Sequence, residues 1–323
     1  MKPESSEPRV VLVSELRDRS ETRQQHARAA RTGAEIRVGH GAYVARLDWD
    51  GLAERERYLL RLSAFARTRV RTPTFSHWSA AVIHGLPFIG PIPSELHVTV
   101  GRTSGGRSAR EVVAHSTEVD AADLTVVSGL RCTSITRTVV DLAATTRRPD
   151  AVAAADHFLR TAAAIGGDGA AALLAAWMRA QPMRGHRRAL DVIAFADGRA
   201  ESPLESVSRV SIHAAGLAQP DLQTPFSDGA GRIGFVDFAW PSARVIGEAD
   251  GDRKYLDAAV RGGRTAERVV LDEKIREDRL RALGWRVVRW RWSTARDQRT
   301  LAATLSAVGV PRANTPWRDC AAA

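Results

Sequence analysis

The stretch RIGFVDFAWPSARVIGEADG, from Arg232 to Gly251, decides how the C-terminal third of the chain is interpreted. Apolar residues alternate along both of its halves and a proline-containing turn separates them, which is typical of two neighbouring strands. Asp237 lies within the first strand and Glu248 within the second. A buried carboxylate is unfavourable unless it is paired, hydrogen-bonded or bound to a cation, and two at one sheet edge repel. We therefore expect Mg²⁺, with Mn²⁺ as an alternative, between Asp237 and Glu248.

The segments around this stretch predict a mixed α/β core over residues 198–310. A helix precedes the two strands, with a proline in its first turn and Gly216 at its end. A second helix, over 265–283, and a final strand in WRVVRWRW follow them. Glu205, on the first helix, shares a helical face with Glu201 and is a third candidate acid.

The preceding residues divide into two further predicted parts. Residues 1–47 suggest a winged helix-turn-helix, with two short helices capped by Ser14 and Ser20 and a hairpin around Gly39 and Gly41. Residues 48–197 predict a mixed helical and strand region, in which LTVVSGLRCTS is interpreted as one strand. Residues 311–323 are expected to form a loose tail. The predicted fold class is therefore α/β, of the α+β type.

The composition limits the classes of partner and compartment. The 323 residues carry a formal net charge of +10, with a pI near 10.7, which favours a polyanion such as DNA. Nearly all of the positive charge is arginine, and the chain is also rich in alanine, as a GC-rich genome would encode. If codon bias explains the arginines, the alternative function is a scaffold without DNA contact. Two distant cysteines, and the lack of a signal-like or membrane-spanning run, favour a cytoplasmic protein without membrane attachment.

The C-terminal third resembles a known family through several ordered motifs. SPLES with Glu205, VDFAW with Asp237, EADG with Glu248 and Asp250, and EDRLRALGWRVVRWRW are similar to the very-short-patch-repair branch of the PD-(D/E)XK endonucleases. The resemblance implies a restriction-endonuclease-like fold in which Asp237 and Glu248 hold Mg²⁺ and a metal-activated water attacks a phosphodiester. Glu205 would orient the metal shell or a water.

The resemblance also has a departure at the usual lysine of the motif. Asp250 stands there, and Lys254 is the nearby lysine that could reach back from the following turn. Arg279, on the helix before the final strand, would face the site or the phosphate backbone. The acids also have ordinary structural roles open to them: Asp237 could cap a turn, Glu248 could pair with Arg244 or Arg289, and Asp250 with Gly251 is a common turn dipeptide.

The first half of the chain resembles AbiEi-type antitoxins and transcriptional regulators of abortive-infection systems. The motifs that carry this similarity are the hairpin unit, SHWSAAVIHGLP, LHVTV and GLRCTSITRTVVDLA. It implies DNA binding through the helix that holds Arg23, Arg28 and Arg31, although a solvated helical face is the alternative for each arginine. The histidines of this region lack compact metal-ligand spacing, so we expect packing or surface roles for His77, His84, His97 and His115.

Two functions follow as hypotheses. The first is a DNA-acting protein of defence or DNA processing, in which a winged helix positions a Mg²⁺-dependent endonuclease-like domain. The second is a non-catalytic AbiEi-like antitoxin or transcriptional regulator that uses a degenerate nuclease fold for binding. DNA is the expected partner of both, and a toxin partner or a homodimer is compatible with the second.

Overall fold

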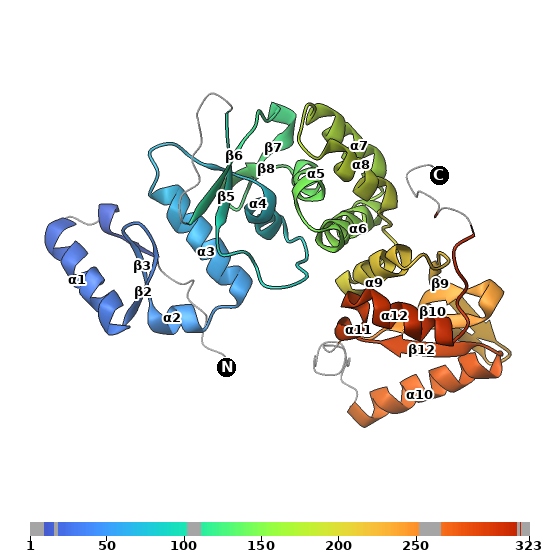
Figure 1. The fold of residues 1–323 in the computed structure, drawn as a ribbon. Helices are drawn as coiled ribbons and strands as arrows, with labels where there is room; N and C mark the ends of the chain where they lie inside the picture. The colour runs from blue at the N-terminus through green and yellow to red at the C-terminus, as the bar shows by residue number, and fades with distance from the viewer. Residues whose placement is uncertain (1–9, 16–18, 102–110, 252–265, 315–316, 318–323) are drawn as a thin grey trace. The chain divides into compact units, whose positions relative to one another are not determined.

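The computed structural model describes residues 10–15, 19–101, 111–251, 266–314 and 317 (Figure 1). Its mixture of helices and several sheets confirms the α+β fold class. The chain divides into two compact units; the first comprises 1–86, 90–142 and 176–183, and the second comprises 87–89, 143–175 and 184–323. The three-part division of the chain stays a prediction.

The first unit begins with a three-stranded sheet in the order β1-β3-β2. Its elements are β1 (Val11–Leu12), α1 (Arg19–Thr32), β2 (Glu35–Gly39), β3 (Ala42–Ala45) and α2 (Arg46–Asp50). The β2–β3 hairpin forms where Gly41 supplies a φ of 65°. The described residues before it hold one α-helix and a 3₁₀ turn at Val13–Glu15, where two short helices were expected. α1 begins at Arg19, one residue before Ser20, and it runs as one helix to Thr32 because no glycine or proline interrupts the sequence before Gly33.

A five-stranded sheet in the order β6-β5-β4-β8-β7 forms the rest of this unit. Its strands are β4 (Thr74–Phe75), β5 (Leu96–Val100), β6 (Val112–Ser116), β7 (Leu124–Val127) and β8 (Leu130–Thr133), with helices α3 (Glu54–Arg67) and α4 (His77–His84) and the 3₁₀ turn Ala121–Asp123. The stretch expected as one strand is the β7–β8 hairpin. Its turn residues Ser128 and Gly129 have φ of 48° and 76°, as a tight hairpin turn requires.

Four helices follow this sheet in the sequence, before the first strand-bearing segment of the second unit. They are α5 (Ile135–Thr145), α6 (Arg148–Ala164), α7 (Gly169–Arg179) and α8 (His186–Phe195). The boundaries between the two compact units fall within α5, after Leu142, and within α7, before Ala176. α6 and α8 belong entirely to the second unit.

The second unit is built around a four-stranded sheet in the order β12-β11-β10-β9. Its elements are α9 (Pro203–Ala214), β9 (Asp221–Asp228), β10 (Gly231–Trp240), β11 (Val245–Ala249), α10 (Ala266–Ala282), β12 (Arg286–Trp290), α11 (Trp292–Arg296) and α12 (Gln298–Ala307), with a 3₁₀ turn at Pro241–Ala243. β10 is antiparallel to both β9 and β11, and β11 is parallel to β12. The expected helix, two strands, helix and strand are confirmed, and β9 is an edge strand that was not expected.

Helices cover both faces of this sheet (Figure 1). One core cluster joins α9, α11 and α12 to the sheet through residues such as Phe238 and Trp290, and a second joins α10 to it through Leu280. Gly247 is required beneath Trp290, because a Cβ there would lie 2.4 Å from Trp290 Cη2. The Trp290 indole donates to Ser208 Oγ at 2.8 Å, which fixes α9 against the sheet.

A buried ion pair joins α6 to α9 within the second unit. Arg209 Nη1 lies 2.8 Å from Asp156 Oδ2, and Arg209 Nη2 donates to the Phe195 carbonyl at 2.7 Å. Asp156 also accepts from Ser206 Oγ and from the Asp197 amide. Both charged groups therefore have several hydrogen-bond partners, as buried charges require. Within the described ranges, no helix combines the length and the apolar character needed to cross a membrane.

Candidate carboxylate site

Asp237 and Glu248 lie on neighbouring strands of the second unit and face the same side of the sheet. Phe238 pairs with Gly247 in the antiparallel β10–β11 ladder, so Asp237 and Glu248 are the next opposing positions. Both residues are buried, at 9% and 5% exposure. Asp237 Oδ2 accepts a hydrogen bond from the Ala249 amide at 2.8 Å, which ties it to the strand that carries Glu248.

Glu205 reaches this pair from the first turn of α9. Ser202 is the N-cap residue and its hydroxyl donates to Glu205 Oε1 at 2.8 Å, while the Glu201 amide donates to Oε2 at 2.9 Å. This is close to a capping box, in which a glutamate in the first turn bonds back to the start of the helix. Glu205 is 4% exposed, so the same carboxylate both caps α9 and enters the buried cluster.

Gln223 bridges the helix-borne acid to the strand-borne one. Its Nε2 donates to Glu205 Oε2 at 3.0 Å and lies 3.4 Å from Asp237 Oδ1. Gln223 has a φ of 48°, a left-handed conformation that is uncommon for a residue with a long side chain. Such backbone strain is retained where the surroundings fix it, and here it accompanies the amide bridge between two carboxylates.

The electrostatics of the cluster reflect the crowding of like charges. Burial, and next the Asp237 carboxylate, raise the pKa of Glu205 to about 7. The same two causes raise the pKa of Glu248 to about 8, although the guanidinium groups of Arg276 and Arg289 act in the opposite direction. Asp237 is therefore the central charge that acts on both glutamates. A buried group of acids with this property is a candidate for cation binding or proton transfer.

Arg276, on α10, is the guanidinium hydrogen-bonded to Glu248, where Arg244 or Arg289 was the expected partner. Its Nη1 and Nη2 lie 3.1 and 2.8 Å from Glu248 Oε1, and Nη2 also donates to the Phe235 carbonyl at 2.8 Å. Nη1 lies 3.0 Å from Glu273 Oε1 on the same helix. Within the described part of the chain, Asp237 has no guanidinium among its hydrogen-bond partners, so only one of the two strand acids is paired in this way.

The other predicted site residues lie in different surroundings. Asp250 Oδ2 is 3.2 Å from Arg289 Nη1, and Arg289 also bonds Glu273 and Glu277. Asp250 thus lies in an ion-pair network that borders the cluster. Lys254 falls outside the described residues.

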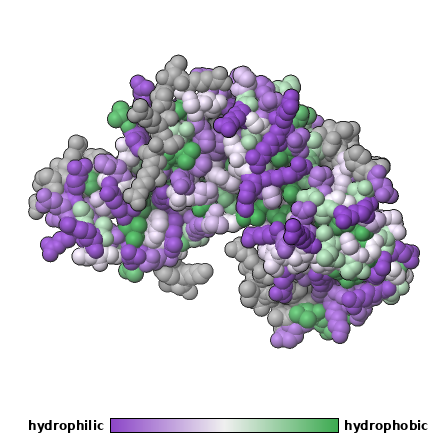
Figure 2. Space-filling view, in the orientation of Figure 1, coloured by the Kyte–Doolittle hydropathy of each residue, from purple (hydrophilic) through white to green (hydrophobic). Residues whose placement is uncertain are grey.

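Arg279 lies one turn after Arg276 and is held at the β9–β10 turn. Its guanidinium contacts Asp228 at 2.6 and 2.8 Å and donates to the Gly231 carbonyl at 2.9 Å. It therefore bonds the strand turn, and Arg276 bonds the acid cluster. α10 also exposes three apolar residues, Val270, Leu271 and Ile275, and Figure 2 shows a small hydrophobic patch in the region of this helix.

The chemistry of the donor atoms on the two strands fits a hard divalent cation. Asp237 and Glu248 offer carboxylate oxygens from adjoining strands, and Mg²⁺ usually takes one or two carboxylates together with waters and phosphate oxygens. Among the described residues, no group of three or more His, Cys, Asp or Glu side chains has the arrangement needed to hold a metal. A metal at this site would therefore take the strand pair as its protein ligands, with Glu205 acting through Gln223.

The arginines expected to contact DNA lie on α1 of the first unit. Arg23, Arg28 and Arg31 are all exposed, and the described residues give none of them an ion-pair partner. Three such guanidinium groups on one helix can contact phosphates, and they can equally form a solvated face.

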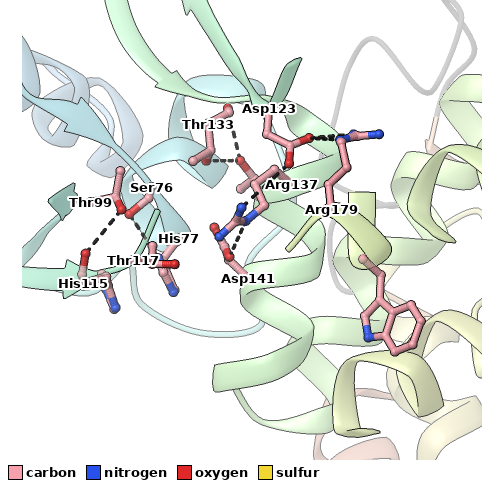
Figure 3. Close-up of polar contacts among 12 residues, drawn as sticks. Ser76, His77, Thr99, His115, Thr117, Asp123, Thr133, Arg137, Asp141 and Arg179 are labelled. Atoms are coloured by element: carbon pink, nitrogen blue, oxygen red, sulfur yellow. Dashed lines mark hydrogen bonds and ion pairs between the residues drawn. The ribbon is translucent and has the colours of Figure 1, made fainter. Parts of the chain in front are cut away.

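The first unit contains a second cluster of ionisable side chains, which the sequence spacing did not predict (Figure 3). The rings of His77 and His115 stack at 3.5 Å between centroids, and His97 Nδ1 lies 3.0 Å from His115 Nε2. Burial is the main cause that lowers the pKa of all three, and it lowers the pKa of His97 to about 4. The expected surface or packing role therefore takes the form of a packed group of neutral imidazoles. His84 lies apart from it, with Nε2 2.7 Å from the Thr133 carbonyl oxygen.

A buried ion-pair network lies beside these histidines (Figure 3). Arg137 bonds Asp141 at 2.9 Å and lies 3.7 Å from Asp123, which Arg179 contacts at 2.6 Å. Burial raises the pKa of Asp141 to about 6 despite Arg137. These contacts join α5 and α7 to the turn before β7.

Sequence reasoning missed Gln223 and Arg276 as members of the carboxylate site. Gln223 carried no signal, because its strand contains Pro225 and polar residues and was not recognised. The sequence signal for Arg276 was weak: it lies three residues before Arg279 and therefore on the same face of the predicted helix.

Comparison with known proteins adds relatives of unestablished function. The chain is 34% identical over 167 residues to uncharacterized proteins of two Mycobacterium tuberculosis strains, CDC 1551 / Oshkosh and ATCC 25618 / H37Rv. The match covers 52% of this chain and 57% of each relative, so the chain spans little more than half the length of these curated relatives. No family model matches the chain.

Proposed function

We propose that this protein acts on DNA, and that its second unit hydrolyses phosphodiester bonds with Mg²⁺ while α1 of its first unit contacts the duplex. The observation that supports this most strongly is the burial of Asp237 and Glu248 side by side on β10 and β11. Two carboxylates placed so closely need a positive charge, and a divalent cation that also engages phosphate would supply it.

The residues of the chain have separate roles in this proposal. Asp237 and Glu248 hold the cation, and the Ala249 amide fixes the orientation of Asp237. Glu205 positions Asp237 through Gln223. A Mg²⁺ ion bound there lowers the pKa of water and stabilises charge on the phosphoryl oxygens. In the reaction, a water oxygen adds to phosphorus, one P–O ester bond breaks, and the two products carry a phosphate and a hydroxyl end.

The alternative is a regulator or antitoxin whose second unit binds DNA or a toxin without cleavage. Two observations favour it: Glu248 is already paired with Arg276, and Asp250 stands at the usual lysine position and is paired with Arg289. The exposed Arg23, Arg28 and Arg31 serve this function equally well. We place either activity in the cytoplasm, with which the buried free thiol of Cys132 is compatible.

Plasmid cleavage separates the two functions. The full chain is incubated with supercoiled plasmid and Mg²⁺ or Mn²⁺, alongside Asp237→Ala and a matched control, Asp221→Asn, which changes an exposed carboxylate of the same sheet. The nuclease proposal expects nicking by the wild type and the control and none by Asp237→Ala. Cleavage that persists in Asp237→Ala contradicts the site assignment, and salt-sensitive binding without any cleavage supports the regulator.

DNA binding by α1 has its own measurement. Replacement of Arg28 and Arg31 by alanine removes two exposed charges from the helix. If both contact phosphates, affinity for duplex DNA falls and the slope of log K against log salt decreases by about 2. An unchanged slope would place DNA binding elsewhere on the chain.

A further inference from the structure

Arg276 occupies a position in the carboxylate site that the proposed function leaves unexplained. Both of its terminal nitrogens bond one oxygen of Glu248, at 3.1 and 2.8 Å. Its side chain is 20% exposed and that of Glu248 is 7% exposed, so the pair is largely removed from solvent. A guanidinium here is therefore the counter-ion of Glu248 when no other cation is present.

The surroundings of Arg276 give it a second partner on its own helix. Arg276 Nη1 lies 3.0 Å from Glu273 Oε1, and Glu273 also bonds Arg289. The guanidinium can therefore give up Glu248 and still keep a carboxylate neighbour. Its other anchor, the Phe235 carbonyl at 2.8 Å, lies at the sheet surface, where Phe235 itself is 47% exposed. Release from Glu248 would thus not leave Arg276 as an isolated buried charge.

Other positive groups of the region are already engaged with acids outside the cluster. Arg289 contacts Glu273, Glu277 and Asp250, and Arg279 contacts Asp228. In the part of the chain that the structure describes, Arg276 is thus the arginine that is hydrogen-bonded directly to a cluster acid. A cation that binds Glu248 must displace it or share the same carboxylate with it, and like charges in this space repel.

We infer that Arg276 is a positioning residue that competes with a divalent cation for Glu248 and so sets the affinity of the site for metal. This inference rests on the proposed metal-dependent function. When the cation is bound, Arg276 turns to Glu273 and remains beside the cluster as a fixed positive charge. In the metal-free protein, the site is closed to cations until Arg276 moves.

The test measures binding of Mn²⁺ alone, without a substrate. The metal-free full chain is titrated with Mn²⁺, and free Mn²⁺ is followed by its electron paramagnetic resonance signal. The variants are Arg276→Met, Arg276→Gln and Arg276→Lys, with Arg281→Met as the matched control, since Arg281 pairs only with Glu277 of the same helix in the described contacts. Far-UV circular dichroism and the thermal midpoint verify that each variant is folded.

The inference expects Arg276→Met and Arg276→Gln to bind Mn²⁺ about tenfold more tightly than the wild type, because a repelling unit charge is removed. Arg276→Lys and Arg281→Met should keep the wild-type affinity within about twofold, as changes that preserve the local charge or lie away from it. In plasmid cleavage, Arg276→Met should be slower than the wild type despite its tighter metal binding. A residue with only a structural role would not raise affinity and lower activity together.

Failure of this inference is distinct from failure of the proposed function. Unchanged or weaker Mn²⁺ binding by both neutral variants, when the wild type binds through Asp237, overturns the competition by Arg276. If the wild type and Asp237→Asn bind Mn²⁺ equally, the carboxylate site is not a metal site and the proposed function itself is overturned. Tighter binding by Arg276→Met that Asp237→Asn abolishes in the double variant supports both.

Discussion

Replacement of Asp237 by asparagine should stabilise the metal-free protein while it removes the metal response. Burial, and next the Asp237 carboxylate, raise the pKa of both Glu205 and Glu248, so Asp237 is the charge whose loss relieves the repulsion on both glutamates. Asparagine keeps an oxygen that can accept from the Ala249 amide, which contacts Asp237 Oδ2 at 2.8 Å. The substitution is therefore nearly isosteric; it removes the charge and, with it, the acceptor that faces Gln223 Nε2 at the longer distance of 3.4 Å.

The magnitude follows from the distances in the cluster. Glu205 Oε2 and Asp237 Oδ1 lie 3.0 and 3.4 Å from the same Gln223 nitrogen. Two like charges within about 6 Å repel by about 3 kcal/mol at an effective dielectric of about 20. Partial protonation of the glutamates and the charge of Arg276 offset part of this. We expect Asp237→Asn to raise the free energy of unfolding of the second unit by about 1–2 kcal/mol in EDTA.

Mg²⁺ should reverse the order of stability of the wild type and Asp237→Asn. Ligand at about 100 times its Kd stabilises the form that binds it by about 2.7 kcal/mol, so Mg²⁺ should raise the unfolding midpoint of the wild type and leave that of Asp237→Asn unchanged. Calorimetry of both proteins in EDTA and in Mg²⁺ gives the four midpoints. An Asp237→Asn protein that is less stable than the wild type in EDTA would refute the repulsion described above. Equal Mg²⁺ responses would refute the metal site.

Three further predictions concern the fold around the sites. Gly247→Ala should destabilise the second unit by about 3 kcal/mol in urea denaturation, because the new Cβ overlaps Trp290 at 2.4 Å; a loss below about 1 kcal/mol would contradict this packing. Asp156→Ala should cost about 3–5 kcal/mol, because Arg209 is left buried without its partner; replacing both by apolar residues should recover much of that loss in a double-mutant cycle, and additive losses would count against the pairing. Burial, with a smaller effect of a neighbouring imidazole, holds the pKa of His97 near 4, so its stabilising contribution is complete above about pH 6.5 and falls by about 3 kcal/mol as pH decreases towards 4. His97→Gln should reduce the slope of the unfolding free energy against pH between pH 7.5 and 5. Equal slopes in the wild type and His97→Gln would contradict the lowered pKa of His97.

Much of the second unit could be predicted because its local patterns agree with its packing. Alternation places β10 and β11, and the Ser-Pro start with Gly216 at the end marks α9. β9 was missed because it is an edge strand with polar side chains facing solvent and Pro225 within it, which removes the usual apolar signal. The β7–β8 hairpin was missed for a related reason: its Ser-Gly turn interrupts an apolar run only briefly.

The carboxylate site shows where sequence patterns stop being informative. The pairing of Asp237 with Glu248 follows from strand adjacency, which alternation and a short turn predict. The choice between Arg276 and Arg279 depends on how α10 is rotated against the sheet, and that rotation is set by the packing of Leu280 in the core. The histidine cluster depends on the pairing of β5 with β6, across residues 101–111, and no periodicity in the sequence encodes that pairing.

Glu205 performs two tasks with one side chain, since it closes the first turn of α9 and belongs to the acid cluster. A ligand that draws this carboxylate towards itself must weaken the hydrogen bonds that the carboxylate accepts from the Glu201 amide and the Ser202 hydroxyl. The first turn of α9 would then fray. The rate of hydrogen–deuterium exchange of the backbone amides near Ser202 should therefore report whether a ligand occupies the carboxylate site, and the measurement needs no nucleic acid.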